Sequence, residues 1–179
     1  YLLDESLRRP VTIWSAGCAR GEEPYTIAML LHELEPKLSA RSVRIIATDI
    51  DTEAMAAARE RRYGEWAFRQ TPYFMQRKYF AASDGQLVLN AGVGQAVEFA
   101  YHHVAVDLDL PSFPGDGFDL ILCRNVLMYL RQDFRMKAGR GLARRLNRGG
   151  ILLTGEVERI EGADDLLAPG DAQVEPPLA

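Results

Sequence analysis

The sequence is poor in the side chains that hold metal ions and disulfides. It has two cysteines, Cys18 and Cys123, and three histidines in 179 residues. The cysteines lack the spacing of a metal site, and so few of them are typical of reduced thiols in a cytosolic protein. His102 and His103 are adjacent in a segment with strand character, so their side chains should point to opposite faces. We therefore predict no metal site and a cytoplasmic protein.

Long apolar runs and a large excess of one charge are also absent. No apolar segment approaches the roughly 18 residues of a membrane span, and no signal-peptide pattern is present. Lys and Arg total 21 against 25 for Asp and Glu, a net charge of −4, which argues against a nucleic-acid binder. Length and a hydrophobic content of 47% fit one soluble globular domain, although the start at Tyr1 suggests a trimmed or partial chain.

Charge is unevenly distributed along the chain. Residues 156–179 hold seven acids and one base, a sum of −6, which leaves +2 for residues 1–155. Seven bases fall within one 18-residue segment that has a single acid, and they are Arg131, Arg135, Lys137, Arg140, Arg144, Arg145 and Arg148. Such a run is typical of a solvated helix face, or it forms a docking surface for an acidic protein or a nucleic acid.

Short apolar segments alternate with amphipathic ones. Strand character is found at 11–15, 43–48, 97–106, 118–123 and 151–154, and helices are expected at 22–35, 53–62 and 132–147. This order predicts a parallel sheet with helices on both faces. Residues 63–96 break the pattern, and we expect an inserted helix near 72–80 and a small hairpin there.

Further details of these elements are predicted. The apolar face of the first helix should consist of Ile27, Leu30, Leu31 and Leu34. The last helix should end in a turn at 147–150. We expect the main domain to cover residues 1–155, followed by an acidic tail at 156–179 with partly ordered last strands.

The turn after the first strand is the first candidate site. It runs from Ser15 to Glu23, and its glycines, Gly17 and Gly21, let the backbone approach a ligand. Glu22 and Glu23 disfavour a phosphate at the helix N-terminus and suit a cationic group, such as the amino group of an aminoacyl moiety. The simpler interpretation is a tight turn whose glutamates only complement the helix dipole.

Polar residues also follow two other strands. Asp49, after the second strand, could accept both hydroxyls of a ribose. The simpler interpretation is a turn at Asp49 and a helix cap at Asp51. After the apolar strand that begins at position 118, Arg124, Asn125 and Tyr129 place polar groups at the same edge of the predicted sheet.

Three segments together resemble the CheR-type chemoreceptor glutamate methyltransferases, which use S-adenosylmethionine (SAM). They are IWSAGCARGEEPYTIAMLL, ATDIDTEAMAAARERRYG and FDLILCRNVLMYL, and they occur in family order between about residues 11 and 155. The inserted segment 63–96 falls where that family has a small β-subdomain. The resemblance implies an α/β, Rossmann-like SAM-dependent methyltransferase fold with a mostly parallel, doubly wound sheet.

The resemblance also implies a role for each residue that matches a family motif. Around the methionine end of SAM it places the turn residues Ser15, Gly17, Gly21, Glu22 and Glu23. Asp49 would hold the ribose hydroxyls, Asp107 and Leu108 would lie near the adenine, and Arg124 and Asn125 would line the pocket. Tyr129 would lie near the transferred methyl group, which makes Tyr129 and Arg124 the expected catalytic residues.

The chain departs from the family pattern in four places. Arg20 stands where the family usually has Thr, and Gly155-Glu156-Val157-Glu158 stands where it has Gly-His-Ser-Glu. The amino-terminal helical domain of the family is missing. The hairpin after Phe80 lacks the Gly-x-Gly of members that grip the carboxyl-terminal peptide of a receptor, which indicates receptor binding without that tail.

By this resemblance, the protein is a monomer that transfers a methyl group from SAM to glutamate side chains in the cytoplasmic region of chemoreceptors. A glutamate has a pKa of about 4.3, so the acceptor is already ionised and positioning, not a general base, is needed. The alternatives are another protein or a small carboxylic acid as substrate, and a SAM-binding sensor without catalysis. An RNA methyltransferase that uses the basic helix is the least favoured.

Overall fold

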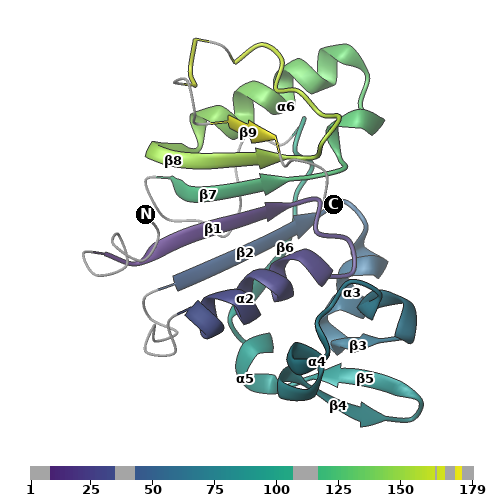
Figure 1. Ribbon diagram of the computed structural model, residues 1–179. Coiled ribbons are helices and arrows are strands. Elements are labelled where there is room, and N and C mark those ends of the chain that lie inside the picture. Colours follow the sequence, from purple (N-terminus) through teal and green to yellow (C-terminus); the bar gives the residue numbers. More distant parts are fainter. Residues whose placement is uncertain (1–8, 35–42, 107–116, 164, 168–171, 175–179) are drawn as a thin grey trace.

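Six parallel strands form the central sheet (Figure 1). The computed structural model describes residues 9–34, 43–106, 117–163, 165–167 and 172–174. The strands are β1 (Val11–Ala16), β2 (Val43–Asp49), β6 (Val97–Tyr101), β7 (Phe118–Cys123), β8 (Leu146–Thr154) and β9 (Ala172–Val174), in the order β6-β2-β1-β7-β8-β9. This confirms the predicted parallel α/β sheet. Because the strand order reverses between β1 and β7, ligands are expected at the carboxyl ends of these strands.

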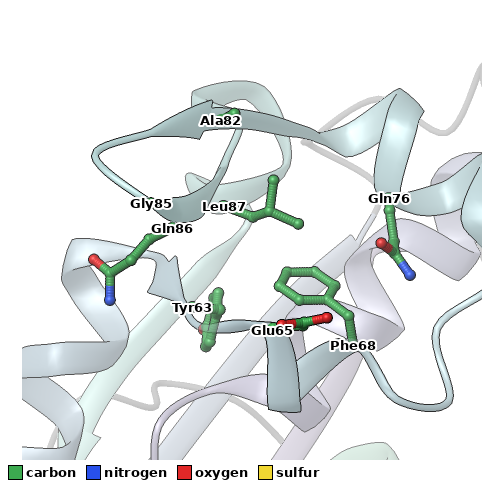
Figure 2. A pocket seen from close by; sticks show the side chains of 8 residues that line it. All are labelled: Tyr63, Glu65, Phe68, Gln76, Ala82, Gly85, Gln86 and Leu87. Atoms are coloured by element: carbon green, nitrogen blue, oxygen red, sulfur yellow. The ribbon is translucent and has the colours of Figure 1, made fainter.

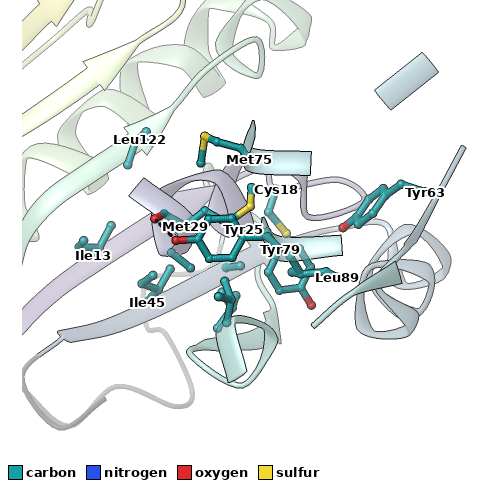
Figure 3. Packing of buried hydrophobic residues seen from close by; sticks show 14 of the residues in the cluster. Ile13, Cys18, Tyr25, Met29, Ile45, Tyr63, Met75, Tyr79, Leu89 and Leu122 are labelled. Atoms are coloured by element: carbon teal, nitrogen blue, oxygen red, sulfur yellow. Dashed lines mark hydrogen bonds between the residues drawn. The ribbon is translucent and has the colours of Figure 1, made fainter. Parts of the chain in front are cut away.

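Helices cover both faces of the sheet. The main ones are α2 (Glu22–Leu34), α3 (Thr52–Glu60) and α6 (Gln132–Arg144). On one face, Tyr25 and Met29 of α2 share a buried cluster with Ile13, as Figure 3 shows. On the other face, Leu142 of α6 shares a cluster with Trp14. Since successive side chains of a strand point to opposite faces, β1 is buried on both sides.

The buried face of α2 differs from the predicted one. Leu30 and Leu34, two of the four residues predicted for it, are 46% and 66% exposed. The buried residues are Pro24, Tyr25, Ala28 and Met29. The Tyr25 hydroxyl donates to the carbonyl oxygen of Ala58 in α3 at 3.0 Å, and this contact helps set the rotation of α2. The prediction was therefore wrong for Leu30 and Leu34, because tertiary contacts set the rotation of the helix, whereas Ile27 and Leu31 do pack against the buried cluster.

A small subdomain is inserted between α3 and β6. Its elements are β3 (Arg62–Tyr63), the 3-10 helix η1 (Glu65–Phe68), α4 (Tyr73–Tyr79), β4 (Phe80–Ser83), β5 (Gln86–Leu89) and α5 (Ala91–Gly94). The strands form an antiparallel sheet in the order β3-β5-β4, so the predicted hairpin is present and β3 is an additional strand. Edge-to-face contacts among Tyr63, Phe68 and Phe80, with ring centroids 4.8–6.4 Å apart, stabilise this unit.

The last helix ends earlier than predicted, and the last long strand begins earlier. Residues 147–150, predicted as a turn, lie in β8. The side-chain amide of Asn147 donates to the buried carboxylate of Asp119 at 2.8 Å and so holds the start of β8 against β7. Leu146 pairs with Phe118, but the register then shifts, because Leu120 pairs with Ile151. Residues 147–150, where the turn was predicted, therefore form an irregular stretch between two paired parts of β8, with Gly149 at a φ of +78°.

Residues 155–163, called the return segment, follow β8 and lie against α6. A Cβ on Gly139 would lie 2.6 Å from the carbonyl oxygen of Glu161, so the helix needs a glycine at this contact. Arg135 forms an ion pair with Glu161 at 3.3 Å, and Arg140 donates to a carbonyl oxygen of the return segment at 2.8 Å. The acidic tail therefore takes up part of the basic run within the same chain.

Candidate functional site

The carboxyl ends of β2, β1 and β7 lie side by side and bring the three predicted site segments together. In the sheet register, Ala16 of β1 faces Thr48 of β2, and Ser15 faces Leu122 of β7. The turn after β1, Asp49 at the end of β2 and the loop after β7 therefore share one edge of the sheet. This edge includes the reversal point between β1 and β7.

The turn after β1 is closed by backbone contacts that require glycine. Gly17 has a φ of +82°, and its N–H donates to the carbonyl oxygen of Thr48 at 2.7 Å. A Cβ at this position would lie 2.2 Å from Cγ2 of Val126, in the loop after β7. Gly21 has a φ of +85°, and its Cβ would lie 3.0 Å from that of Ala58. The turn is therefore pressed against both the loop after β7 and helix α3.

Asp49 is held by the turn that it faces. Its Oδ2 accepts the N–H of Ala19 at 2.7 Å, and its Oδ1 accepts the N–H of Asp51 at 2.9 Å. Each carboxylate oxygen has a second lone pair, so Asp49 can still accept two hydroxyl groups. Asp51 is the helix cap expected from the sequence, since its side chain accepts the N–H groups of the first turn of α3 at 2.9–3.0 Å.

The two glutamates that follow the turn differ in exposure and in their contacts. Glu22 is exposed. The side chain of Glu23 is only 21% exposed; its Oε1 accepts the Ser15 hydroxyl at 2.7 Å, and its Oε2 lies 3.6 Å from Nη1 of Arg124. Glu23 thus links the end of β1 to the loop after β7 and presents a fixed carboxylate at the sheet edge.

The loop after β7 carries the remaining candidate residues. Asn125 has a left-handed φ of +57°, and Tyr129, at the end of the 3-10 helix η2 (Leu127–Tyr129), is 80% exposed. Glu158 of the return segment, which was not among the predicted site residues, lies behind this loop and is only 3% exposed. The only sequence signal for it is the final glutamate of Gly155-Glu156-Val157-Glu158, which matches the last residue of the family's Gly-His-Ser-Glu.

Two of the predicted residues are not described by the structure, and the two cysteine thiols are buried. Asp107 and Leu108, expected near an adenine, lie outside the described residues. Cys18 lies in the turn after β1, where burial and, to a lesser degree, the charge of Asp49 raise its pKa to about 12. Burial, together with nearby carboxylates, also raises the pKa of the Cys123 thiol. Neither thiol is therefore ionised at neutral pH, which makes both poor nucleophiles.

A pocket of about 260 Å³ lies in the inserted subdomain (Figure 2). Its lining residues are Tyr63, Glu65, Phe68, Gln76, Ala82, Gly85, Gln86 and Leu87. None of the predicted site residues contributes to it. The strand ends that carry the site therefore do not form the walls of this pocket.

Comparison with known proteins identifies the family. Residues 2–174 match the family model described as "CheR methyltransferase, SAM binding domain". The chain belongs to the CheR methyltransferase family. S-adenosylmethionine is accordingly the cofactor, as predicted.

Individual relatives agree with this assignment. The chain is 33% identical over 168 residues to a "Probable chemotaxis protein methyltransferase" of Rhizobium etli, covering 90% of the chain and 62% of that relative. It is 35% identical to a "Chemotaxis protein methyltransferase" of Borreliella burgdorferi (87% and 55% covered) and 32% identical to one of Listeria monocytogenes (95% and 59%). The chain thus spans less than two thirds of the length of these relatives.

A solved structure supports the same fold. The DszA carbon methyltransferase superposes with a TM-score of 0.53 at 17% sequence identity, over 84% of this chain and 31% of that one. At this identity the likeness concerns the fold alone. Within the described residues, no helix combines the length and apolar character of a membrane span, and no cluster of three or more metal-binding side chains is present.

Proposed function

We propose that this CheR domain transfers the methyl group of SAM to glutamate side chains of chemoreceptors. The observation that carries the proposal is the pair of fixed carboxylates, Glu23 and Asp49, at the ends of neighbouring strands around the Gly17 turn. The names of the CheR relatives, which refer to chemotaxis, support the chemoreceptor as substrate. The reduced, buried cysteines fit a cytoplasmic protein.

The donor set at this edge fits SAM. Glu23 would hold the ammonium group, Asp49 the two ribose hydroxyls, and Arg124 and Asn125 would line the pocket. No phosphate has to be accommodated, which agrees with two glutamates at the start of α2. When bound, SAM supplies an electrophilic methyl group on a positively charged sulfur.

Methylation of a glutamate makes few chemical demands on the protein. The acceptor carboxylate has a pKa of about 4.3 and is ionised at neutral pH, so no general base has to remove a proton. The work of the site is to align the acceptor and exclude water, and such positioning can supply several kcal/mol. Arg124 carries the positive charge suited to orient the acceptor carboxylate, and Tyr129 offers the side chain that would pack beside the reacting groups.

The exposed side chains beside the site favour a protein substrate over a small carboxylic acid. Tyr129 is 80% exposed and Met128 49%. Val157 of the return segment is 74% exposed. Exposed apolar and aromatic side chains beside the site suit the surface of a folded partner, here the cytoplasmic region of a receptor met by a single copy of the enzyme.

Binding of S-adenosylhomocysteine, measured by calorimetry, tests the cofactor site. Asp49→Asn should weaken this binding by about tenfold or more, because one carboxylate oxygen becomes a donor that faces backbone N–H groups. Asp51→Asn is the matched control, since it removes a charge two residues away and asparagine is an equally good helix cap. Equal affinities of both variants and the wild type would contradict the ribose role of Asp49.

Transfer of labelled methyl from SAM to receptor membranes tests the activity. The proposal predicts base-labile methyl esters on the receptor. A protein that binds S-adenosylhomocysteine but forms no such ester would be a SAM-binding sensor. A protein that methylates another carboxylate but not the receptor would refute the substrate and leave the reaction type intact.

A further inference from the structure

Glu158 places a buried carboxylate behind the loop that carries three candidate site residues. Among the described residues, Glu158 and Asp119 are the only acids that are this deeply buried, at 3% and 0% exposure. An ionised group in such a position is costly unless hydrogen bonds replace its lost water. Its partners therefore indicate what this carboxylate does.

The partners of the Glu158 carboxylate are two backbone amides of the loop and one of the return segment. Oε2 accepts the N–H of Asn125 at 2.7 Å and the N–H of Gly155 at 2.9 Å. Oε1 accepts the N–H of Met128 at 3.1 Å. Hydrogen bonds to an ionised acceptor are roughly twice as strong as neutral ones. The Glu158 side chain thus accepts the hydrogen bonds that these N–H groups would otherwise have to make with water.

These bonds hold the loop at a residue in the left-handed region. Asn125 has a φ of +57°, a conformation that asparagine adopts more readily than most residues with a Cβ and that turns the backbone sharply. The residue before it, Arg124, reaches Glu23 across the sheet edge at 3.6 Å. The residue after it, Val126, lies against Gly17 of the turn after β1. The bond to the Asn125 amide therefore holds the point at which the loop turns toward both carboxylate-bearing segments.

Glu158 is itself fixed in place. Its own N–H donates to the carbonyl oxygen of Gly155 at 2.9 Å, and the Thr154 hydroxyl donates to its carbonyl oxygen at 3.2 Å. A Cβ on Gly155 would lie 2.7 Å from Oε2 of Glu158 and 3.1 Å from the Asn125 nitrogen, so this packing requires glycine. Three residues later, the ion pair of Glu161 with Arg135 ties the return segment to α6.

We propose that Glu158 is a positioning residue: its carboxylate holds the loop at 124–129 in the conformation that sets Arg124, Asn125 and Tyr129 for methyl transfer. The inference rests on the proposed function for its catalytic part. Glu158 touches neither the cofactor nor the acceptor in this role, because it is only 3% exposed. It acts by fixing the loop before either ligand arrives.

Glu158→Gln is the direct test, with Glu161→Gln as the matched control on the same segment. Glutamine has nearly the same shape, but its amide nitrogen would face one of the three N–H groups. We expect kcat, measured well below the melting temperature, to fall about 10- to 100-fold, with KM for the receptor changed by less than about threefold. Glu161→Gln should leave both constants at the wild-type values, because that side chain contacts Arg135 and not the loop.

Hydrogen–deuterium exchange provides a readout that does not depend on catalysis. The amides of residues 125 and 128 should exchange faster in Glu158→Gln than in the wild type, while strand β1 keeps its protection. Gly155→Ala is a second variant for the case in which Glu158→Gln does not fold. Its new methyl group displaces the carboxylate without removing the charge, and it should give the same pattern.

The outcomes separate this inference from the proposed function. Wild-type kinetics together with unchanged exchange at 125 and 128 in both variants would overturn the positioning role. If the wild-type chain forms no methyl ester, the proposed function fails, and the exchange measurement still decides whether Glu158 fixes the loop. A fall in melting temperature with kcat, KM and exchange unchanged would reduce Glu158 to a contributor to stability and would also overturn the proposal.

Discussion

Replacing Gly17 with alanine should destabilise the fold and weaken cofactor binding together. Gly17 has a φ of +82°, where a residue with a Cβ costs about 1–2 kcal/mol. The new Cβ would also lie 2.2 Å from Cγ2 of Val126, and such overpacking typically costs about 1–3 kcal/mol. The free energy of unfolding should therefore fall by about 2–5 kcal/mol. Urea unfolding measures this loss, and calorimetry with S-adenosylhomocysteine measures the loss of affinity.

The double variant Gly17→Ala/Val126→Ala separates the two causes. Shortening Val126 removes the overlapping methyl group but leaves the backbone strain, so a double-mutant cycle should recover about 1–3 kcal/mol. Gly92→Ala is the control, because Gly92 is exposed and the nearest atom to its added Cβ is 3.8 Å away. Its stability should change by no more than about 0.5–1 kcal/mol.

Two results would refute the reasoning. One is a Gly17→Ala protein as stable as the wild type. The other is a cycle without coupling between positions 17 and 126, which would mean that the turn and the loop adjust independently. Either result would mean that the turn after β1 and the loop after β7 do not constrain each other.

Three further predictions concern charge, the exposed site and the thiols. Asp119→Asn should cost about 2–4 kcal/mol at neutral pH, because the buried carboxylate binds Arg9, Asn147 and a backbone amide. Burial alone would raise its pKa, but these donors hold the pKa of Asp119 below its usual range. Its contribution is therefore present above about pH 4 and is lost as the pH falls through the folded-state value, so urea unfolding should show the variant and the wild type converging in acid. Tyr129→Ala should change stability by less than about 0.5 kcal/mol, since the side chain is 80% exposed, while methyl transfer falls at least about tenfold; an unchanged rate would exclude this tyrosine from the mechanism. Burial raises the pKa of Cys18 to about 12, so a thiol reagent at neutral pH should modify it and the other cysteine only after unfolding, and rapid modification of the native protein would contradict the structure.

The sheet could be predicted from the sequence because its signals are local. The run from Val11 to Ala16 is apolar and β-branched and becomes a strand buried on both faces. Asp51 precedes a helical segment and becomes its cap. The turn at Asp84 and Gly85 joins two apolar segments and becomes a hairpin. In each case neighbouring residues decide the outcome, as with caps and tight turns in general.

The errors have a different physical origin, because they depend on residues far apart in the chain. Tyr25 of α2 binds Ala58 of α3, and Asn147, within the irregular stretch of β8, binds Asp119 of β7. Glu158 reaches a loop about thirty residues earlier, and no local pattern marks that contact. The candidate site could therefore be predicted where its residues form a continuous motif. Glu158 was missed, because its side chain contacts the loop from a distant part of the chain.

The pairing of α6 with the return segment affects how the molecule meets a charged partner. A helix with so many bases suggests a surface that draws acidic proteins in from a distance and speeds their arrival. Here Arg135 and Arg140 face acids of the same chain, at 3.3 Å from Glu161 and from Asp165. Beyond a Debye length of about 8 Å, such pairs largely cancel. Encounter with an acidic receptor should therefore depend less on ionic strength than the number of bases in this run suggests, and short-range contacts at the sheet edge gain in importance.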